Sequence, residues 1–221
     1  MITRSKRLIG LGVLGIFFLM NPALVKASPS SCDTVSGNLI TVNCGFEAGV
    51  VGNAPLGWVT DAGFALHVGG FNQVVNGNAH SGSNALQFGN FDSEPPAGIS
   101  QTFADTNGQN YTVTFFMFDG GAANQDAGAF FDAQINGSNM FTRTGKTAPA
   151  AYPGTGFTFS FTGTGSDTLS FLADTTPSEF YLDDISVVAN GSTNTPEPTS
   201  MVLLGSGLAG LWFKRRGAKT A

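Results

Sequence analysis

The sequence predicts an all-β domain built as a two-sheet sandwich, and three observations carry this prediction. The 221-residue chain is rich in Phe (20) and Gly (30), with many Thr and Asn. Phe and Thr favour strands, whereas Gly and Asn favour turns. Short strand-like runs are separated by Asn-Gly and Asp-Gly turn dipeptides. No stretch between residues 28 and 189 shows sustained helical periodicity, so seven or eight short strands are expected.

The expected strands follow the alternation of apolar and polar residues along the chain. They lie at 39–43, 85–88, 111–118, 130–135, 157–161, 169–172 and 180–188. The run at 157–161 reads Phe-Thr-Phe-Ser-Phe, a strict period of two that places three Phe on one face. Seventeen of the Phe lie in this middle region, which is enough for a substantial core between two sheets.

The charge of the chain is unevenly distributed. Four of its ten basic residues lie near the start and four near the end. Between Ser28 and Thr195 only Arg143 and Lys146 stand against fourteen Asp and Glu, a net charge of −12. This surface would repel a polyanion, so nucleic acid is excluded as a partner. The acidic residues also leave carboxylates available for a hard cation.

Residues 1–27 have the pattern of a secretory signal peptide. Arg4, Lys6 and Arg7 form a basic start, and an apolar run of thirteen residues follows at 8–20. Thirteen residues are short for a membrane-spanning helix, which disfavours the alternative of an N-terminal anchor. We expect cleavage after Ala27 and a folded domain over 28–189.

The C-terminal region contains a polar linker at 190–195, the motif Pro196, Glu197 and Pro198, an apolar run at 200–213 and a basic cluster at 214–216. The basic cluster should hold that end in the cytoplasm. Fourteen helical residues cover only about 21 Å of a hydrocarbon core of about 30 Å. A plain tail anchor would explain the transmembrane segment at 200–213 and the charges, but not the Pro-Glu-Pro.

Residues 196–221 resemble the PEP-CTERM sorting signal, in which Pro-Glu-Pro, a short transmembrane stretch and a basic cluster follow in this order. The resemblance implies processing by an exosortase in a Gram-negative bacterium, typically one that makes exopolysaccharide. It places the protein at the cell envelope or surface, or outside the cell. Whether the tail is cut or kept as an anchor is left open.

Cys32 and Cys44 are the two cysteines of the chain. In an exported protein, a pair this close in sequence predicts a disulfide, and the alternative is two free buried thiols. In the chain-entropy account, closing so short a loop stabilises the fold by roughly 3 kcal/mol.

The middle domain carries short motifs in a recognisable order, at 38–40, 43–47, 57–58, 79–86, 99–103, 111–115 and 180–185. This order resembles the galactose-binding-like jelly rolls, especially the carbohydrate-binding modules of xylanases and glucanases. The resemblance implies a jelly-roll sandwich over 28–189 and contact with polysaccharide, although many domains with this fold bind no known sugar.

The same resemblance implies a structural calcium ion between the Gly-Phe-Glu segment and the terminal Asp-Asp strand. Glu47 and Asp183 would supply carboxylate oxygens, with Asp184 as a further candidate. Asp183 shares strand parity with Tyr181, Ile185 and Val187, so we expect it to face inward and Asp184 to face outward. The alternative is that these acids accept backbone hydrogen bonds or stay solvated.

Two aromatic residues are candidates for carbohydrate binding. Trp58 would either stack on a sugar ring or pack into the core. Tyr152 lies in an Ala-Tyr-Pro-Gly loop and is expected to be exposed.

No catalytic cluster is evident. His67 and His80 lack partners at zinc spacing, and there is no Gly-x-Ser-x-Gly motif. We therefore expect a non-catalytic surface or matrix protein that contacts exopolysaccharide. The alternatives are a structural or self-associating protein without a ligand and, third, a glycoside hydrolase. The hydrolase would need two carboxylates across a cleft, and the neighbours Asp92 and Glu94 do not suggest them.

Overall fold

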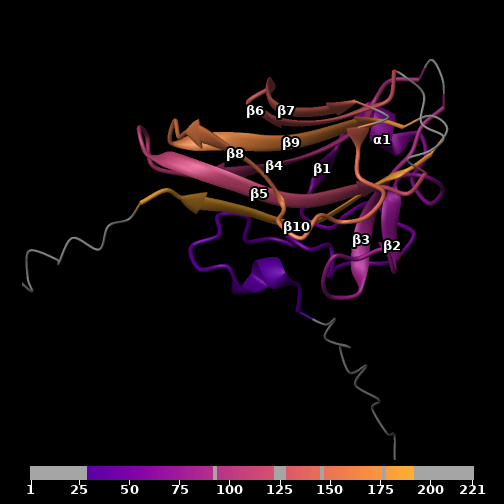
Figure 1. Cartoon of the computed structure of the whole chain (residues 1–221), viewed down its shortest axis with the longest axis horizontal. Coiled ribbons are helices and arrows are strands. Elements are labelled where there is room, and N and C mark those ends of the chain that lie inside the picture. The colour runs from indigo at the N-terminus through magenta and orange to yellow at the C-terminus, as the bar shows by residue number, and fades with distance from the viewer. Residues whose placement is uncertain (1–28, 92–93, 122–127, 145–146, 176–177, 192–221) are drawn as a thin grey trace, which may run out of the picture.

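The computed structural model describes residues 29–91, 94–121, 128–144, 147–175 and 178–191. These residues form two antiparallel sheets that pack face to face (Figure 1). The predicted all-β jelly-roll sandwich is confirmed. The expected signal segment at 1–27 and transmembrane segment at 200–213 lie outside the described residues. None of the helices in the described ranges has the length and apolar character that a membrane crossing requires.

We name the two five-stranded sheets after their central strands. The β9 sheet has the order β1 (Val59–Thr60), β4 (Ala97–Ala104), β9 (Ser166–Asp174), β6 (Phe130–Ile135) and β7 (Ser138–Thr144). The β10 sheet has the order β2 (Gln73–Asn76), β3 (Asn84–Phe88), β10 (Phe180–Ala189), β5 (Asn110–Asp119) and β8 (Phe157–Thr162). Two short helices accompany them, η1 (Ser31–Thr34) and α1 (Ala62–Ala65).

Six of the seven expected strands are present, and the one expected at 39–43 is wrong. That segment instead runs beside β10, where Leu39 N donates to Val187 O at 2.9 Å and Ile185 N donates to Cys44 O at 3.0 Å. Asn43 has a left-handed backbone (φ 53°), which ends any extended run. The strands β1, β2, β4 and β7 were not among those expected.

Phe side chains from both sheets fill the space between them. Phe115 on β5 lies at their centre, and its ring contacts those of Phe131, Phe141, Phe157, Phe159 and Phe171 at 5.1–6.4 Å between centroids. The three alternating Phe of β8 face this core as predicted, since all three belong to it or pack against it. The core therefore draws on both sheets about equally.

Candidate functional site

Four side chains form a row across the outer face of the β10 sheet. In register, Phe118 lies opposite Tyr181, Tyr181 opposite Gln87, and Gln87 opposite Gln73. Their neighbours along the strands point into the core and are buried: Met117, Leu182, Leu86 and Val74. Because side chains alternate along a strand, the four residues of this outer row face away from the core, although Gln87 is only 9% exposed. Three strand spacings give the row a length of about 14 Å.

The aromatic half of the outer row is a stacked pair. The rings of Phe118 and Tyr181 are nearly parallel, 4.9 Å apart at an angle of 18°. Tyr152 packs edge-on against Phe118 at 4.7 Å, and its hydroxyl donates to Asn78 O at 2.7 Å. Burial, and then the nearby charges of Asp183 and Asp184, raise the pKa of Tyr152, so the phenol stays protonated. Tyr152 is half-buried and buttresses the pair, whereas the sequence suggested an exposed ring.

A second ring pair joins this surface to acids below it. The His80 ring stacks on Phe116 with 3.5 Å between centroids and lies edge-on to Tyr152. His80 Nδ1 is 2.6 Å from a carboxylate oxygen of Asp184. The aromatic surface is therefore coupled directly to the Asp-Asp segment of β10.

Both acids of β10 are buried, which corrects the prediction for Asp184. Asp183 is 0% exposed and Asp184 only 3%. The register between β10 and β5 shifts between Asp183 and Ser186, and Asp184 has a left-handed backbone (φ 46°). Such a bulge breaks the alternation of faces, so the parity argument fails for both acids. Asp183 lies opposite Phe116 on the same side of the sheet as Tyr181, and not on the inner side with Ile185 as expected.

The environment moves the pKa values of the two acids in opposite directions. Burial and the charge of Asp184 raise the pKa of Asp183 to about 8, although Ser81 N, Asp184 N and His80 N donate to its carboxylate at 2.7–3.1 Å. Burial acts on Asp184 in the same sense. There the hydrogen bonds from Ser81 and His80 outweigh it and hold the pKa below its usual range.

Glu47 supplies a third carboxylate near the loop between β2 and β3. Its Oε1 accepts hydrogen bonds from Ser83 N at 2.7 Å and Asn84 N at 2.9 Å. Its Oε2 is buried and has no hydrogen-bond partner among the described residues. A buried, unsatisfied carboxylate oxygen is costly unless a donor or a cation meets it.

Two of these acids have features of a calcium ligand, and the third does not. The free Oε2 of Glu47 and the raised pKa of Asp183 are both features that a cation would relieve. Both oxygens of Asp184, however, already accept hydrogen bonds from Cys32 N, Ser81 and His80. The carboxylate oxygens of Glu47, Asp183 and Asp184 do not all lie within 4.8 Å of one another. Glu47 and Asp183 therefore remain the two candidate ligands, and Asp184, whose oxygens are already occupied, is not a third.

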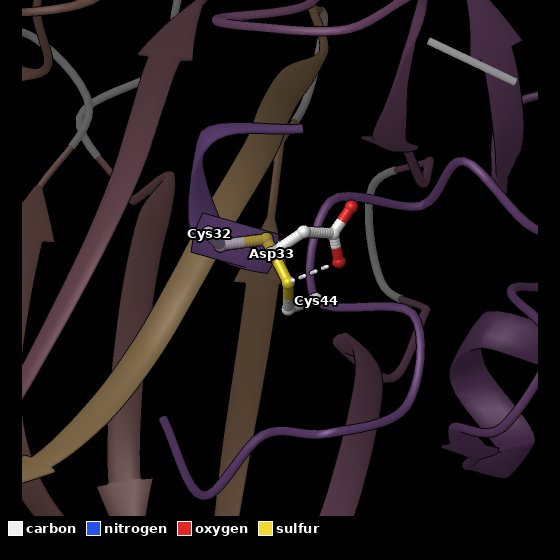
Figure 2. A group of neighbouring side chains, drawn as sticks. All are labelled: Cys32, Asp33 and Cys44. Atoms are coloured by element: carbon white, nitrogen blue, oxygen red, sulfur yellow. Dashed lines mark hydrogen bonds between the residues drawn. A yellow bond between two sulfur atoms is a disulfide. The ribbon is translucent and has the colours of Figure 1, made fainter. Parts of the chain in front are cut away.

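Cys32 and Cys44 are joined by a disulfide (Figure 2). An oxygen of the Asp33 carboxylate lies 3.5 Å from Cys44 Sγ. These three side chains are close enough to suggest a metal site, but sulfurs in a disulfide offer no thiolate. The bridge instead holds the N-terminal segment against β10. There Asn38 donates to Ile185 O at 3.1 Å and accepts from Val187 N at 2.9 Å, just beyond the bulge.

Trp58 lies in the core. It is 7% exposed, its ring packs between Phe46 and Phe171, and its Nε1–H donates to Asn43 O at 3.2 Å. It therefore offers no ring face to a sugar, which decides between the two alternatives for this residue.

Another aromatic group, which the sequence did not suggest, lies at the end of the sandwich near α1. The rings of His67, Phe71 and Phe91 pack edge-to-face with centroids 5.1–5.7 Å apart. His67 Nε2 is 2.7 Å from a carboxylate oxygen of Glu94. We call these four residues the end cluster. In the sequence, Phe71 stands between Gly70 and Asn72, which indicates a Phe in a loop. The exposure of its ring and its contacts could not be predicted from the sequence.

Comparison with known proteins bears on the tail and the fold separately. Residues 194–216 match the family described as a PEP-CTERM protein-sorting motif. No curated protein matches the chain. Because the motif covers only the tail, it leaves the middle domain to be compared through its structure.

Several solved structures resemble the domain. The structure of TmCBM61 in complex with β-1,4-galactotriose is 18% identical and covers 70% of this chain and all of its own, with a TM-score of 0.49. The Stig cyclase Fisc from Fischerella sp. TAU is 16% identical and covers 74% of this chain and 97% of its own, with a TM-score of 0.51. A CBM4 structure is 19% identical and covers 67% and 98%, with a TM-score of 0.42.

Likeness at this level of identity concerns the fold alone. The chain carries a PEP-CTERM protein-sorting motif after a two-sheet β-sandwich whose fold is similar to that of the Stig cyclase Fisc.

Proposed function

We propose that this is a non-catalytic surface or extracellular-matrix protein, sorted through an exosortase, whose jelly roll binds polysaccharide on the outer face of the β10 sheet. The sorting motif implies export to the cell envelope or surface of a Gram-negative bacterium. Exopolysaccharide, which bacteria with this sorting signal typically make, is then a partner within reach. The tail would contact the membrane during sorting.

The outer row is the observation that carries the proposal. A pyranose ring has an apolar C–H face that packs on an aromatic ring and hydroxyls that need hydrogen-bond partners. Phe118 and Tyr181 offer a pair of half-buried rings that stack on each other. Gln87 and Gln73 continue the line; Gln87 is only 9% exposed, and the amide nitrogen of Gln73 already donates to Gly70 O at 2.6 Å, which leaves its oxygen to accept from a hydroxyl. A line about 14 Å long suits a chain of sugar units better than a single one.

The geometry also supports a binding role over a hydrolytic one. The acids nearest the aromatic platform, Asp183 and Asp184, lie buried beneath it and are held by hydrogen bonds. A glycoside hydrolase needs two carboxylates that face each other across the bound sugar. Neither of these two is presented in that way.

The test is affinity gel electrophoresis of the full-length chain in gels containing neutral polysaccharides or the host's own exopolysaccharide. We expect Tyr181→Ala to weaken retardation about tenfold, the equivalent of about 1.4 kcal/mol. Ser160→Ala, on the outer face of the same sheet but far from the row, is the matched control and should bind normally. If no polysaccharide retards the wild-type protein, the proposal is rejected.

Self-association is the alternative function, and one observation favours it. Several large apolar side chains near the end of the sandwich are exposed: Val50, Val51, Leu66 and Val68. A structural protein without a ligand would use such a patch to contact a second copy. Light scattering over a range of concentrations decides between them, since a protein that stays monomeric disfavours this alternative.

A structural calcium ion at Glu47 and Asp183 is part of the proposal. The unsatisfied Glu47 oxygen and the buried Asp183 support it. The ion would hold the loop before β3 against β10, directly beneath the aromatic platform.

A further inference from the structure

The end cluster continues the outer face on which the row lies. Phe71 lies in the turn before β2 and not in the strand itself, and its approach to Gly89, two residues after Gln87, puts it on the side of the outer row. It lies over Gly89, where an added Cβ would come within 2.6 Å of the Phe71 Cβ, so glycine allows this close approach. Two strand spacings and two residues along a strand put Phe71 roughly 12 Å from Tyr181.

The rings of the end cluster are the more accessible of the two aromatic groups. Phe91 is 52% exposed and Phe71 is 38% exposed, although both are large apolar side chains. Each ring is fixed by edge-to-face contact with the other and with His67. Rigid, exposed aromatic rings are preorganised for a ligand, because little side-chain freedom is lost on binding.

A carboxylate accompanies these rings. Glu94 Oε2 accepts from Phe91 N at 2.9 Å and lies 2.7 Å from His67 Nε2. These contacts, the first from the Phe91 backbone and the second from His67, lower the pKa of Glu94, so it is ionised at neutral pH. The other oxygen, Oε1, has no hydrogen-bond partner in the part of the chain that the structure describes, and it is free to accept from hydroxyls.

The charge around the end cluster disfavours acidic ligands. The middle of the chain carries a net charge of −12. Arg143 is the one Arg or Lys among the described residues, and its guanidinium lies over the rings of Phe141 and Phe157, at β7 and β8. No described Arg or Lys therefore stands beside Glu94 to offset an anionic sugar, and its neighbour His67 is a cation only when protonated.

We infer that the end cluster is a second sugar subsite, which takes an uncharged hexopyranose unit and rejects uronates. Phe91 and Phe71 pack against the C–H face of the unit, and Glu94 accepts hydrogen bonds from its hydroxyls. A chain of several units would lie on the outer row and reach this subsite. The inference rests on the proposed function, since both take polysaccharide as the ligand.

The test uses the full-length chain in affinity gels with β-1,4-galactan, β-1,3-glucan and β-1,4-mannan, each paired with its C6-carboxylated form. We expect a neutral polymer to bind at least about tenfold more tightly than its carboxylated partner. Phe91→Ala should weaken binding to the neutral polymer about tenfold, and Phe91→Trp should retain it. Glu94→Gln should lower the neutral-to-carboxylated preference by about threefold or more. Met140→Ala, which removes an exposed apolar side chain from the other sheet, is the control.

The outcomes separate the two proposals. If no polymer binds, the proposed function fails. If neutral polymer binds and depends on Tyr181 but not on Phe91, or if the carboxylated form binds as well as the neutral one, the end-cluster inference alone is overturned. A Phe91→Ala protein that binds normally but changes its oligomeric state would assign this surface to a second copy and also overturn the inference.

Discussion

The two sheets contribute similar inner faces but very different outer faces. On the outer side of the β9 sheet, short hydroxyl side chains oppose one another, with Ser100 facing Ser170 and Thr102 facing Thr168 at 2.8 Å between their oxygens. On the β10 sheet Thr112 and Ser160 likewise approach to 3.2 Å between their oxygens, but the outer row across β5, β10, β3 and β2 holds rings and amides. The inner faces build the fold, so the outer faces are free to differ, and one of them is equipped to hold a ligand.

The central strands of the two sheets also differ, since β9 is regular and β10 is not. β9 alternates buried and less buried residues without interruption. β10 contains a bulge with two buried acids and is braced by the disulfide-closed N-terminal segment. A bulge is a cost that β9 avoids, although β9 also buries an acid, Asp167, which is 0% exposed. The bulge of β10 lies under the aromatic surface.

The largest expected effect should be equal in the two sheets. Phe115→Ala in β5 and Phe171→Ala in β9 each remove a fully buried ring and should each lower the free energy of unfolding by about 3–5 kcal/mol. Urea denaturation measures both. A difference of more than about 2 kcal/mol between them would show that the two inner faces are not equivalent.

The second effect is specific to the β10 sheet and depends on pH. The raised pKa of Asp183 means that the folded protein keeps a proton which the unfolded chain releases near pH 3.9. The resulting stability is fully present below about pH 4 and is lost as pH rises toward 8. With chelator present, the loss between pH 4 and pH 7 should be on the order of 4 kcal/mol.

Thermal melts across this range test it. Asp183→Asn should flatten the slope between pH 4 and 8, even though it lowers stability overall by placing an amide against backbone N–H groups. Glu94→Gln is the control, because the pKa of Glu94 is lowered and so acts only at more acidic pH. If the melting temperature of the wild type does not change between pH 4 and 8, the raised pKa of Asp183 is contradicted.

The third effect is the loss of stability when calcium is removed. If the ion binds Glu47 and Asp183, chelation should lower the melting temperature by the equivalent of about 2–3 kcal/mol, as for a ligand present at 100 times its Kd. Asp183→Ala should abolish the difference between chelated and calcium-loaded protein. If chelator leaves the melting temperature of the wild type unchanged, the calcium proposal is rejected.

The smallest effect belongs to the outer face of the β9 sheet. Thr168→Ala removes one exposed hydroxyl contact and should change stability by less than about 0.5 kcal/mol. It should leave polysaccharide retardation unchanged. If Thr168→Ala weakens retardation, the outer face of the β9 sheet also binds polysaccharide, which contradicts the proposed difference between the two sheets.

The sequence predicted which residues of a regular strand face the core. The three Phe of β8 face the core because a strand repeats every two residues, and this can be read from 157–161 alone. Asp184 was misplaced because a bulge carries no sequence signal as clear as alternation, and one extra residue exchanges the faces. The outer row depends on register among four strands that are far apart in sequence, so no single segment reveals it.

The direction of β10 has a consequence for how the protein is presented. The strand begins at Phe180, beside the stacked rings, and ends at Ala189, away from β2 and β3 (Figure 1). Ten residues in a strand span roughly 30 Å. The described chain ends at Gly191, so both aromatic groups lie at the opposite end of the β10 sheet from the point after which the sorting motif follows in the sequence.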